Sequence, residues 1–295
     1  MIAEKKIERY FSVKHKLIFA DNFYHVTQRA PGTEKLFVED TDYLYFLHLL
    51  KENLKKYNID LHSFALMPNH LHLLTYLHKA NLSPAMQKVL QRYAIYFNHK
   101  YKRKGHVFCG GYGCALCNSE RYILTVSLYI HLNPYKAGLV SRIDDYRWSS
   151  VRLYLEPGRK SFVKTDFILS LLDSDQKEAR KTYRRLLGEC GKLRYAPLSD
   201  NMRGLDKIYR KVSGVEGLSC LQRKNSKEVV TADKDILLID NYIKGFKGKK
   251  QLRSPADKRA FTYLIAQLKN RGFTVKEISR ILEVSRFKIS RFCNI

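Results

Sequence analysis

Two histidines separated by one residue form a candidate metal-binding pair. His70 and His72 lie in the sequence PNHLHLL. On a β-strand, residues i and i+2 project from the same face, so we expect the two imidazoles side by side, with Leu71 and Leu73 turned into the core. Two imidazoles at this spacing can bind one divalent cation. Taken alone, the pattern favours two ordinary half-buried histidines, because H-x-H is a common sequence.

A tyrosine and an asparagine in the later sequence YIHLNP form a second candidate. Tyr129 and Asn133 are four residues apart, so on a helix they share a face. If that face is turned toward the histidine pair, the amide oxygen completes a three-ligand site, and the phenol is a nucleophile beside a bound phosphate. On spacing alone, a buried aromatic followed by a helix-capping Asn is the simpler interpretation. We interpret the nearby His62 and His131 as structural or DNA-facing.

The elements that must position these residues alternate between strands and helices. Apolar residues recur with a period of two or of three to four, and Met67-Pro68-Asn69 forms a plausible tight turn between two strands. Strand, helix, hairpin, helix and helix in this order predict an α+β domain, with helices packed on an antiparallel sheet. The expected strands are 22–28, 59–66 and 70–77, and the expected helices are 43–57, 85–102 and 120–133.

The second half of the chain predicts a different organisation. Glu156-Pro157-Gly158 marks a boundary, 166–187 is helical, and 190–255 gives weak signals around the basic stretch 244–250. Three short helices, 255–270, 275–282 and 285–293, fit an all-α region that ends in a helix-turn-helix. We therefore predict three parts: a domain over 1–155, a basic helical or linker region over 156–255 and a helix-turn-helix DNA-binding domain over 256–295.

The charge of the chain favours a polyanionic partner. Of 295 residues, 54 are Lys or Arg and 28 are Asp or Glu, a net charge of +26. This excess disfavours an ordinary acidic small-molecule enzyme and favours DNA, RNA or an anionic surface. We expect a cytoplasmic protein without a membrane span, because no apolar run approaches 18 residues and the N-terminus lacks the apolar region of a signal peptide. The six cysteines are then expected as thiols.

Five stretches in order carry a resemblance to a known family. Together they resemble the single-tyrosine HUH transposases, and among these the REP-associated tyrosine transposases. The resemblance spans about residues 10–155 and implies a ferredoxin-like or RRM-like antiparallel sheet with packed helices. The stretches are YHVTQRA (24–30), FALMPNHLHLL (64–74), RYAIYFNHKYKRKGHVF (92–108), YIHLNPYKAGLV (129–140) and YRWSS (146–150).

The resemblance implies roles for the candidate residues and favours the catalytic interpretation of both. His70 and His72 match the metal-binding HUH pair, Tyr129 the nucleophile, and Asn133 the polar residue that joins the histidines on Mg²⁺ or Mn²⁺. Members of the family cleave single-stranded DNA, commonly beside hairpin or repeat sequences. They form a 5′-phosphotyrosine and leave a 3′-OH, which can rejoin the strand without ATP.

Other functions remain open at this stage. A domesticated regulator would bind repeat DNA without cleaving it, although the presence of all four candidate residues argues against lost chemistry. A plasmid relaxase or replication initiator would use the same chemistry. The resemblance is compatible with a monomer or a homodimer.

One loop departs from the family pattern. After GHVF the family typically has a Gln, then a Gly-Arg pair and basic residues, whereas this chain has a segment that contains Cys109 and Cys114, followed by Cys117. The usual basic DNA contact is therefore missing at this loop. Three cysteines with a C-x-x-C pair are compatible with zinc or with three unligated thiols, and the latter is favoured because a second Cys pair is absent nearby.

Basic residues mark the expected DNA contacts. The segment 86–104 interleaves Lys and Arg with aromatics, a combination that suits single-stranded DNA, because cations follow phosphates while rings stack on bases. A solvated helix with a buried aromatic face is the alternative. The expected contacts are Arg92, Lys100, Lys102, Arg103 and Lys104 in this segment, Lys136 beyond it, and Arg286, Lys288 and Arg291 on the last helix.

Overall fold

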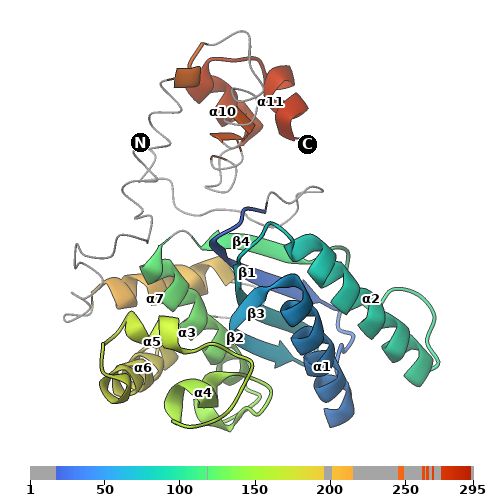
Figure 1. Ribbon diagram of the computed structural model, residues 1–295, viewed down its shortest axis with the longest axis vertical. Helices are drawn as coiled ribbons and strands as arrows, with labels where there is room; N and C mark the ends of the chain where they lie inside the picture. The colour runs from blue at the N-terminus through green and yellow to red at the C-terminus, as the bar shows by residue number, and fades with distance from the viewer. Residues whose placement is uncertain are drawn as a thin grey trace. The chain divides into compact units, whose positions relative to one another are not determined.

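The computed structural model describes residues 18–117, 119–195, 201–214, 245–248, 261–262, 264–265, 268 and 274–293. They fall into two compact units, one within residues 18–214 and one within residues 245–293 (Figure 1). None of the described helices combines the length and the apolar character that a membrane crossing requires. The first unit contains β1 (Asn22–Arg29), α1 (Asp40–Tyr57), β2 (Ile59–Met67), β3 (His70–Leu77), α2 (Leu82–Lys100), β4 (Gly113–Cys117), α3 (Glu120–Lys136), a 3₁₀ turn (Ile143–Asp145), α4 (Val151–Leu155), α5 (Asp166–Ser170), α6 (Gln176–Gly191) and α7 (Asn201–Ser213).

The sheet has four antiparallel strands in the order β2-β3-β1-β4. With α1 between β1 and β2, and α2 between β3 and β4, this is the ferredoxin-like arrangement that the family resemblance implies. Helices α1 and α2 cover one face, and α3 lies on the other (Figure 1). The two central strands, β1 and β3, are therefore covered on both faces.

Strand β3 divides its side chains between the two faces as predicted. Leu71 and Leu73 are fully buried in the core that includes α1 and α2. By the period of two, His70 and His72 project from the opposite face, toward α3. The two-residue turn before β3 is anchored by the Pro68 carbonyl, which accepts hydrogen bonds from the backbone N–H groups of Leu36 and Phe37.

Strand β4 is absent from the elements that the sequence patterns indicate. Its five residues, GCALC, pair with β1, so that Val26 lies opposite Cys114 and Phe23 opposite Cys117. Glycine and cysteine give little local preference for a strand, and the pairing is a long-range contact with β1. The segment therefore forms an edge strand because of its neighbour rather than its own sequence.

The first packing unit extends past residue 155, where the sequence predicts a boundary. Tyr183 of α6 places its hydroxyl 2.8 Å from Ser127 Oγ and 2.7 Å from His131 Nδ1, both on α3. His131 Nε2 lies 2.7 Å from the hydroxyl of Ser150, in the YRWSS segment. Helices α6 and α7 thus pack on α3 as part of the same unit. Of the two roles expected for His131, structural or DNA-facing, these hydrogen bonds support the structural one.

The described part of the second unit contains two short helices in succession. Helix α10 (Val275–Leu282) begins with a capping box between Thr274 and Glu277, and it ends at Glu283 in the left-handed conformation. Helix α11 (Arg286–Cys293) follows after a short turn. Ile278 and Ile289 lie in a small core of their own. The predicted helix 255–270 lies largely outside the described residues.

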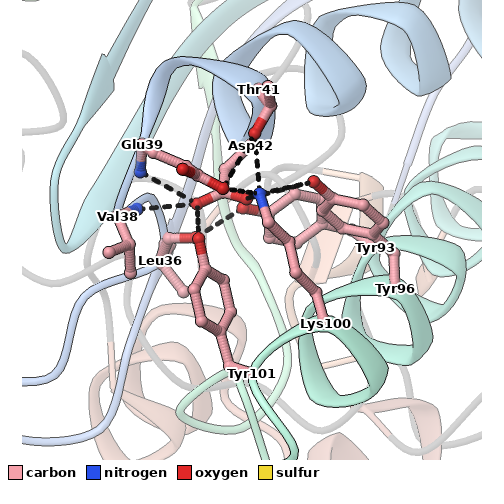
Figure 2. Close-up of polar contacts among 9 residues, drawn as sticks. All are labelled: Leu36, Val38, Glu39, Thr41, Asp42, Tyr93, Tyr96, Lys100 and Tyr101. Atoms are coloured by element: carbon pink, nitrogen blue, oxygen red, sulfur yellow. Dashed lines mark hydrogen bonds and ion pairs between the residues drawn. The ribbon is translucent and has the colours of Figure 1, made fainter.

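A buried carboxylate joins the start of α1 to the end of α2 (Figure 2). Asp42 accepts hydrogen bonds from the backbone N–H groups of Val38 and Glu39, from the Lys100 ammonium at 2.7 Å and from the Tyr101 hydroxyl at 2.7 Å. Burial by itself raises the pKa of Asp42, but the hydrogen bonds from Lys100, Tyr101 and the backbone outweigh this effect and lower it. The carboxylate therefore stays ionised and fixes how the two helices pack.

The cluster around Asp42 leads to a stability prediction. Asp42→Ala removes the carboxylate and leaves the facing donors unpaired, so we expect the free energy of unfolding to fall by about 3 kcal/mol. Urea unfolding measures the change. Asp40→Ala is the control, because Asp40 pairs with Arg147 at a surface where both side chains are 61% exposed. It should cost less than about 1 kcal/mol. Equal losses for the two variants contradict the role given to Asp42.

Candidate active site

The turn before β3 orients the first histidine of the pair. Asn69 Oδ1 lies 2.7 Å from His70 Nδ1. Because an amide oxygen only accepts, the proton is on Nδ1, and Nε2 carries a lone pair. This Nε2 atom is buried and has no hydrogen-bond partner among the described residues. His70 Nε2 is therefore available as a metal ligand on the face of the sheet that α3 covers.

The second histidine of the pair contacts a third imidazole that the sequence patterns do not single out. His25 Nε2, on β1, lies 3.0 Å from His72 Nδ1, and the rings stack with centroids 5.2 Å apart. His25 faces the same side of the sheet because β1 and β3 pair in register, with His25 opposite Leu74. The pairing of β1 with β3 brings His25 to the site, and the local spacing of residues in the sequence does not indicate it.

Helix α3 places the tyrosine over these imidazoles. Ser119 caps the start of α3 by accepting a hydrogen bond from the backbone N–H of Tyr122. Further along the helix, the Tyr129 ring lies 5.6 Å from that of His72 and 6.1 Å from that of His25. The structure thus brings together the predicted nucleophile and the predicted histidine pair.

Asn133 lies one helical turn beyond the tyrosine, as the i, i+4 spacing predicts. Its Nδ2 atom donates to the Tyr129 backbone carbonyl at 2.8 Å. Its Oδ1 atom is buried and lacks a hydrogen-bond partner among the described residues. Unpaired buried acceptors cost free energy, so His70 Nε2 and Asn133 Oδ1 both require a partner such as a cation or a water molecule.

The donor set fits a divalent metal ion. Burial lowers the pKa of His70 to about 4 and that of His72 well below its usual value, so both imidazoles are neutral at pH 7, as metal ligands must be. Two imidazoles and an amide oxygen suit Mn²⁺ and tolerate Mg²⁺. Across the described residues, no cluster of three or more His, Cys, Asp and Glu side chains has metal-binding geometry, and the amide of Asn133 falls outside that set of residue types.

The loop cysteines do not gather into such a cluster. Cys114 and Cys117 lie on β4, and Cys109 is exposed in the preceding segment. Burial raises the pKa of Cys117 well above its usual value, which keeps this thiol protonated and makes it a poor zinc ligand.

The tyrosine is covered in this structure. Tyr129 is 1% exposed, and its ring stacks against Tyr195 with centroids 6.3 Å apart. Gly204 of α7 makes this close approach possible, because a Cβ atom there would lie 2.7 Å from the Tyr195 ring and 3.3 Å from the Tyr129 ring. Burial raises the pKa of the Tyr129 phenol, and a hydrogen bond with Asn133 acts in the opposite direction. Tyr195 and α7 therefore contribute to the burial of the Tyr129 side chain in this structure.

Comparisons with known proteins find a family match for one segment of the chain. Residues 20–133 match the family described as "Transposase IS200 like", a stretch that contains His70, His72, Tyr129 and Asn133. This segment is similar to that family, and the unit within residues 18–214 that contains it is called the transposase domain below. Among solved structures, the chain is similar to a REP-associated tyrosine transposase bound to a REP hairpin, with 14% identity over 52% of this chain and 92% of that chain and a TM-score of 0.44. No curated protein matches the chain significantly.

In the transposase domain, several predicted DNA contacts already have partners. Arg92 pairs with Glu52 at 3.0 Å, and Arg103 pairs with Glu34 at 2.5 Å. Lys100 is held by Asp42 and Glu39 in the cluster described above. The remaining two predicted contacts of this segment, Lys102 and Lys104, are exposed.

The other predicted contacts differ in their surroundings. Lys136 donates to the Gly191 and Leu193 carbonyls at 2.5 Å each, and burial lowers the pKa of its ammonium. Its contacts therefore tie α3 to the end of α6. On α11, Arg286 and Arg291 are exposed, whereas Lys288 lies 5.3 Å from the centre of the Phe261 ring.

The buried histidines of the transposase domain predict acid sensitivity. Burial lowers the pKa of His25, His62 and His70 to about 4 and that of His131 to about 3. Between these values and the unfolded pKa near 6.5, the unfolded chain binds more protons than the folded one, so stability falls as pH falls. From pH 7 to pH 5 we expect a loss of about 1 to 2 kcal/mol for each buried histidine. Urea unfolding at the two pH values measures it. A chain equally stable at both pH values contradicts the burial of these imidazoles.

Proposed function

We propose that the transposase domain cleaves and rejoins single-stranded DNA through a 5′-phosphotyrosine on Tyr129. The observation that carries the proposal is the position of the Tyr129 ring beside His72, on the face where His70 Nε2 and Asn133 Oδ1 are buried without hydrogen-bond partners among the described residues. A phenol next to a set of neutral cation ligands is the arrangement that phosphoryl transfer by a tyrosine needs. The match of residues 20–133 to a transposase family supports the same chemistry.

The proposed reaction balances without an energy source. The Tyr129 phenol loses its proton, and its oxygen forms a bond to the DNA phosphorus. The bond from phosphorus to the 3′-oxygen breaks, and that oxygen leaves as a 3′-OH after taking up a proton. In the joining step a free 3′-OH attacks the phosphotyrosine and releases the phenol. One phosphodiester is exchanged for another, so ATP is not required.

The chain's own residues would hold the metal ion and the DNA. His70, His72 and Asn133 would bind Mg²⁺ or Mn²⁺, which when present polarises the phosphate and lowers the barrier to attack. Asn69 holds the His70 ring so that Nε2 is the free ligand atom. The resemblance to the REP-associated branch favours a hairpin or repeat sequence as the DNA partner. Arg286 and Arg291 of α11 are exposed and would bind DNA phosphates.

A second candidate function is DNA binding without cleavage. The observation that favours it is the cover over Tyr129, because a buried, protonated phenol is not a nucleophile. A domesticated regulator would keep the cover in place and use only the basic surfaces. The two functions differ in whether a covalent adduct forms.

Trapping the covalent intermediate tests the proposed cleavage. Full-length protein is incubated with single-stranded oligonucleotides that carry the hairpins flanking its gene, in Mn²⁺ or Mg²⁺, and is run on a denaturing gel. We expect an adduct that EDTA abolishes and that Tyr129→Phe reduces below detection, because the variant has no nucleophilic oxygen. Tyr135→Phe, on the same helix, is the control and should keep the adduct. Salt-dependent binding with no adduct supports the regulator, and an adduct in Tyr129→Phe means that another tyrosine reacts.

The packing of Tyr195 over Tyr129 leads to a prediction about the rate of adduct formation. Tyr195→Ala removes the ring that stacks on Tyr129, so we expect adduct formation at a saturating hairpin concentration to become several-fold faster. Gly204→Ala should act in the same direction, since its methyl group occupies the position of the Tyr195 ring. Arg210→Ala, at an exposed ion pair with Asp206 on α7, is the control. Unchanged rates in the first two variants would mean that the cover does not limit access.

A further inference from the structure

His25 lies at the candidate site but has no part in the chemistry described above. It is 4% exposed, sits on the central strand β1, and faces α3 beside Tyr129. Its Nε2 atom lies 3.0 Å from His72 Nδ1, and the two rings stack with an angle of 22° between them. His25 is thus a buried polar side chain whose hydrogen-bond partner is a candidate metal ligand. Packing alone does not explain why an imidazole occupies this position.

The contact between the two rings holds a single proton. If the proton is on His25 Nε2, then His72 carries its own proton on Nε2 and cannot bind a cation there. If the proton is on His72 Nδ1, it is donated to His25, and His72 Nε2 carries a lone pair. The contact therefore determines which nitrogen of His72 is available.

The same arrangement occurs at the other histidine of the pair. Asn69 Oδ1 accepts from His70 Nδ1 and leaves His70 Nε2 as the ligand atom. His25 Nε2 faces His72 Nδ1 in the equivalent way. Each candidate ligand thus has one neighbour at its Nδ1 atom. For His70 this neighbour is Asn69 of the turn, and for His72 it is His25 of the adjacent strand. Metal-binding histidines in general donate their second ring N–H to such a partner, which fixes the tautomer and the ring orientation.

We propose that His25 is a positioning residue, which accepts the Nδ1 proton of His72 and so holds His72 Nε2 ready to bind a divalent cation. The inference rests on the proposed function, because it requires that His70, His72 and Asn133 form a metal site. Its location on β1 also couples the site to the sheet, since the hydrogen bond crosses between the two central strands.

Mn²⁺ binding to the full-length protein tests the proposal without any DNA. Free Mn²⁺ is followed by electron paramagnetic resonance during titration of the wild type, His25→Leu, His25→Gln and His72→Ala. We expect His25→Leu to bind Mn²⁺ about 10- to 100-fold more weakly, because it fills the space but accepts no hydrogen bond. His25→Gln, whose side-chain oxygen can accept the same proton, should restore most of the affinity. Circular dichroism shows that each variant is folded.

A second readout reports on the tautomer directly. Long-range ¹H–¹⁵N correlation spectra of the metal-free wild type should show His72 protonated on Nδ1, and His25→Leu should lose this preference. Protonation of His72 on Nε2 in the wild type overturns the inference.

The outcomes separate the inference from the proposed function. Wild-type binding that His72→Ala abolishes and His25→Leu leaves unchanged keeps the metal site and refutes the role of His25. Wild-type binding no tighter than that of His72→Ala refutes the metal site, and the inference falls with it. Weakened binding in His25→Leu together with recovery in His25→Gln supports both.

Discussion

Both faces of the central strand β3 are buried, and the rest of the structure depends on this constraint. One face must be apolar, and Leu71 and Leu73 supply it against α1 and α2. The other face carries His70 and His72 and is covered by α3. Imidazoles in such a place are neutral, because burial penalises their charged form. The same layering that builds the core therefore turns two histidines into potential metal ligands and brings a tyrosine on α3 against them.

The buried polar groups of the transposase domain fall into two kinds. At Asp42 and His131, hydrogen bonds from neighbouring elements satisfy the side chains, and these groups hold helices together. At His70 Nε2 and Asn133 Oδ1, acceptor atoms are buried with no hydrogen-bond partner among the described residues. A fold tolerates this cost where a ligand will supply the missing interaction. Four further buried atoms, on His62, Asn81, Arg121 and Tyr195, also lack such a partner. The candidate active site is therefore located by the two unpaired acceptors together with the Tyr129 ring beside His72.

The helices after residue 155 change how accessible that site is. Helix α6 packs on α3 through Tyr183, and α7 with Tyr195 covers Tyr129. Helix α3 is thus shared between the sheet and these later helices. Tyr129, the proposed nucleophile, lies on this shared helix, so the later helices and the segment of Tyr195 contribute to its burial. The ion pairs of Lys100, Arg92 and Arg103 similarly show that a basic sequence is not by itself a DNA surface.

Local patterns in the sequence determined the strands β1, β2 and β3, the helices α1, α2 and α3, the opposite faces of Leu71 and His72, and the shared face of Tyr129 and Asn133. Each of these follows from the spacing of apolar and polar residues, which repeats every two residues in a strand and every 3.6 residues in a helix. A few neighbouring positions are enough to show such a repeat. Five motifs in order also indicated the family. Only the tertiary structure decided the pairing of β4 with β1, the contact between His25 and His72, the cover over Tyr129 and the partners of the basic side chains. These join residues that lie dozens of positions apart, and no local period encodes which strand or helix will lie beside another.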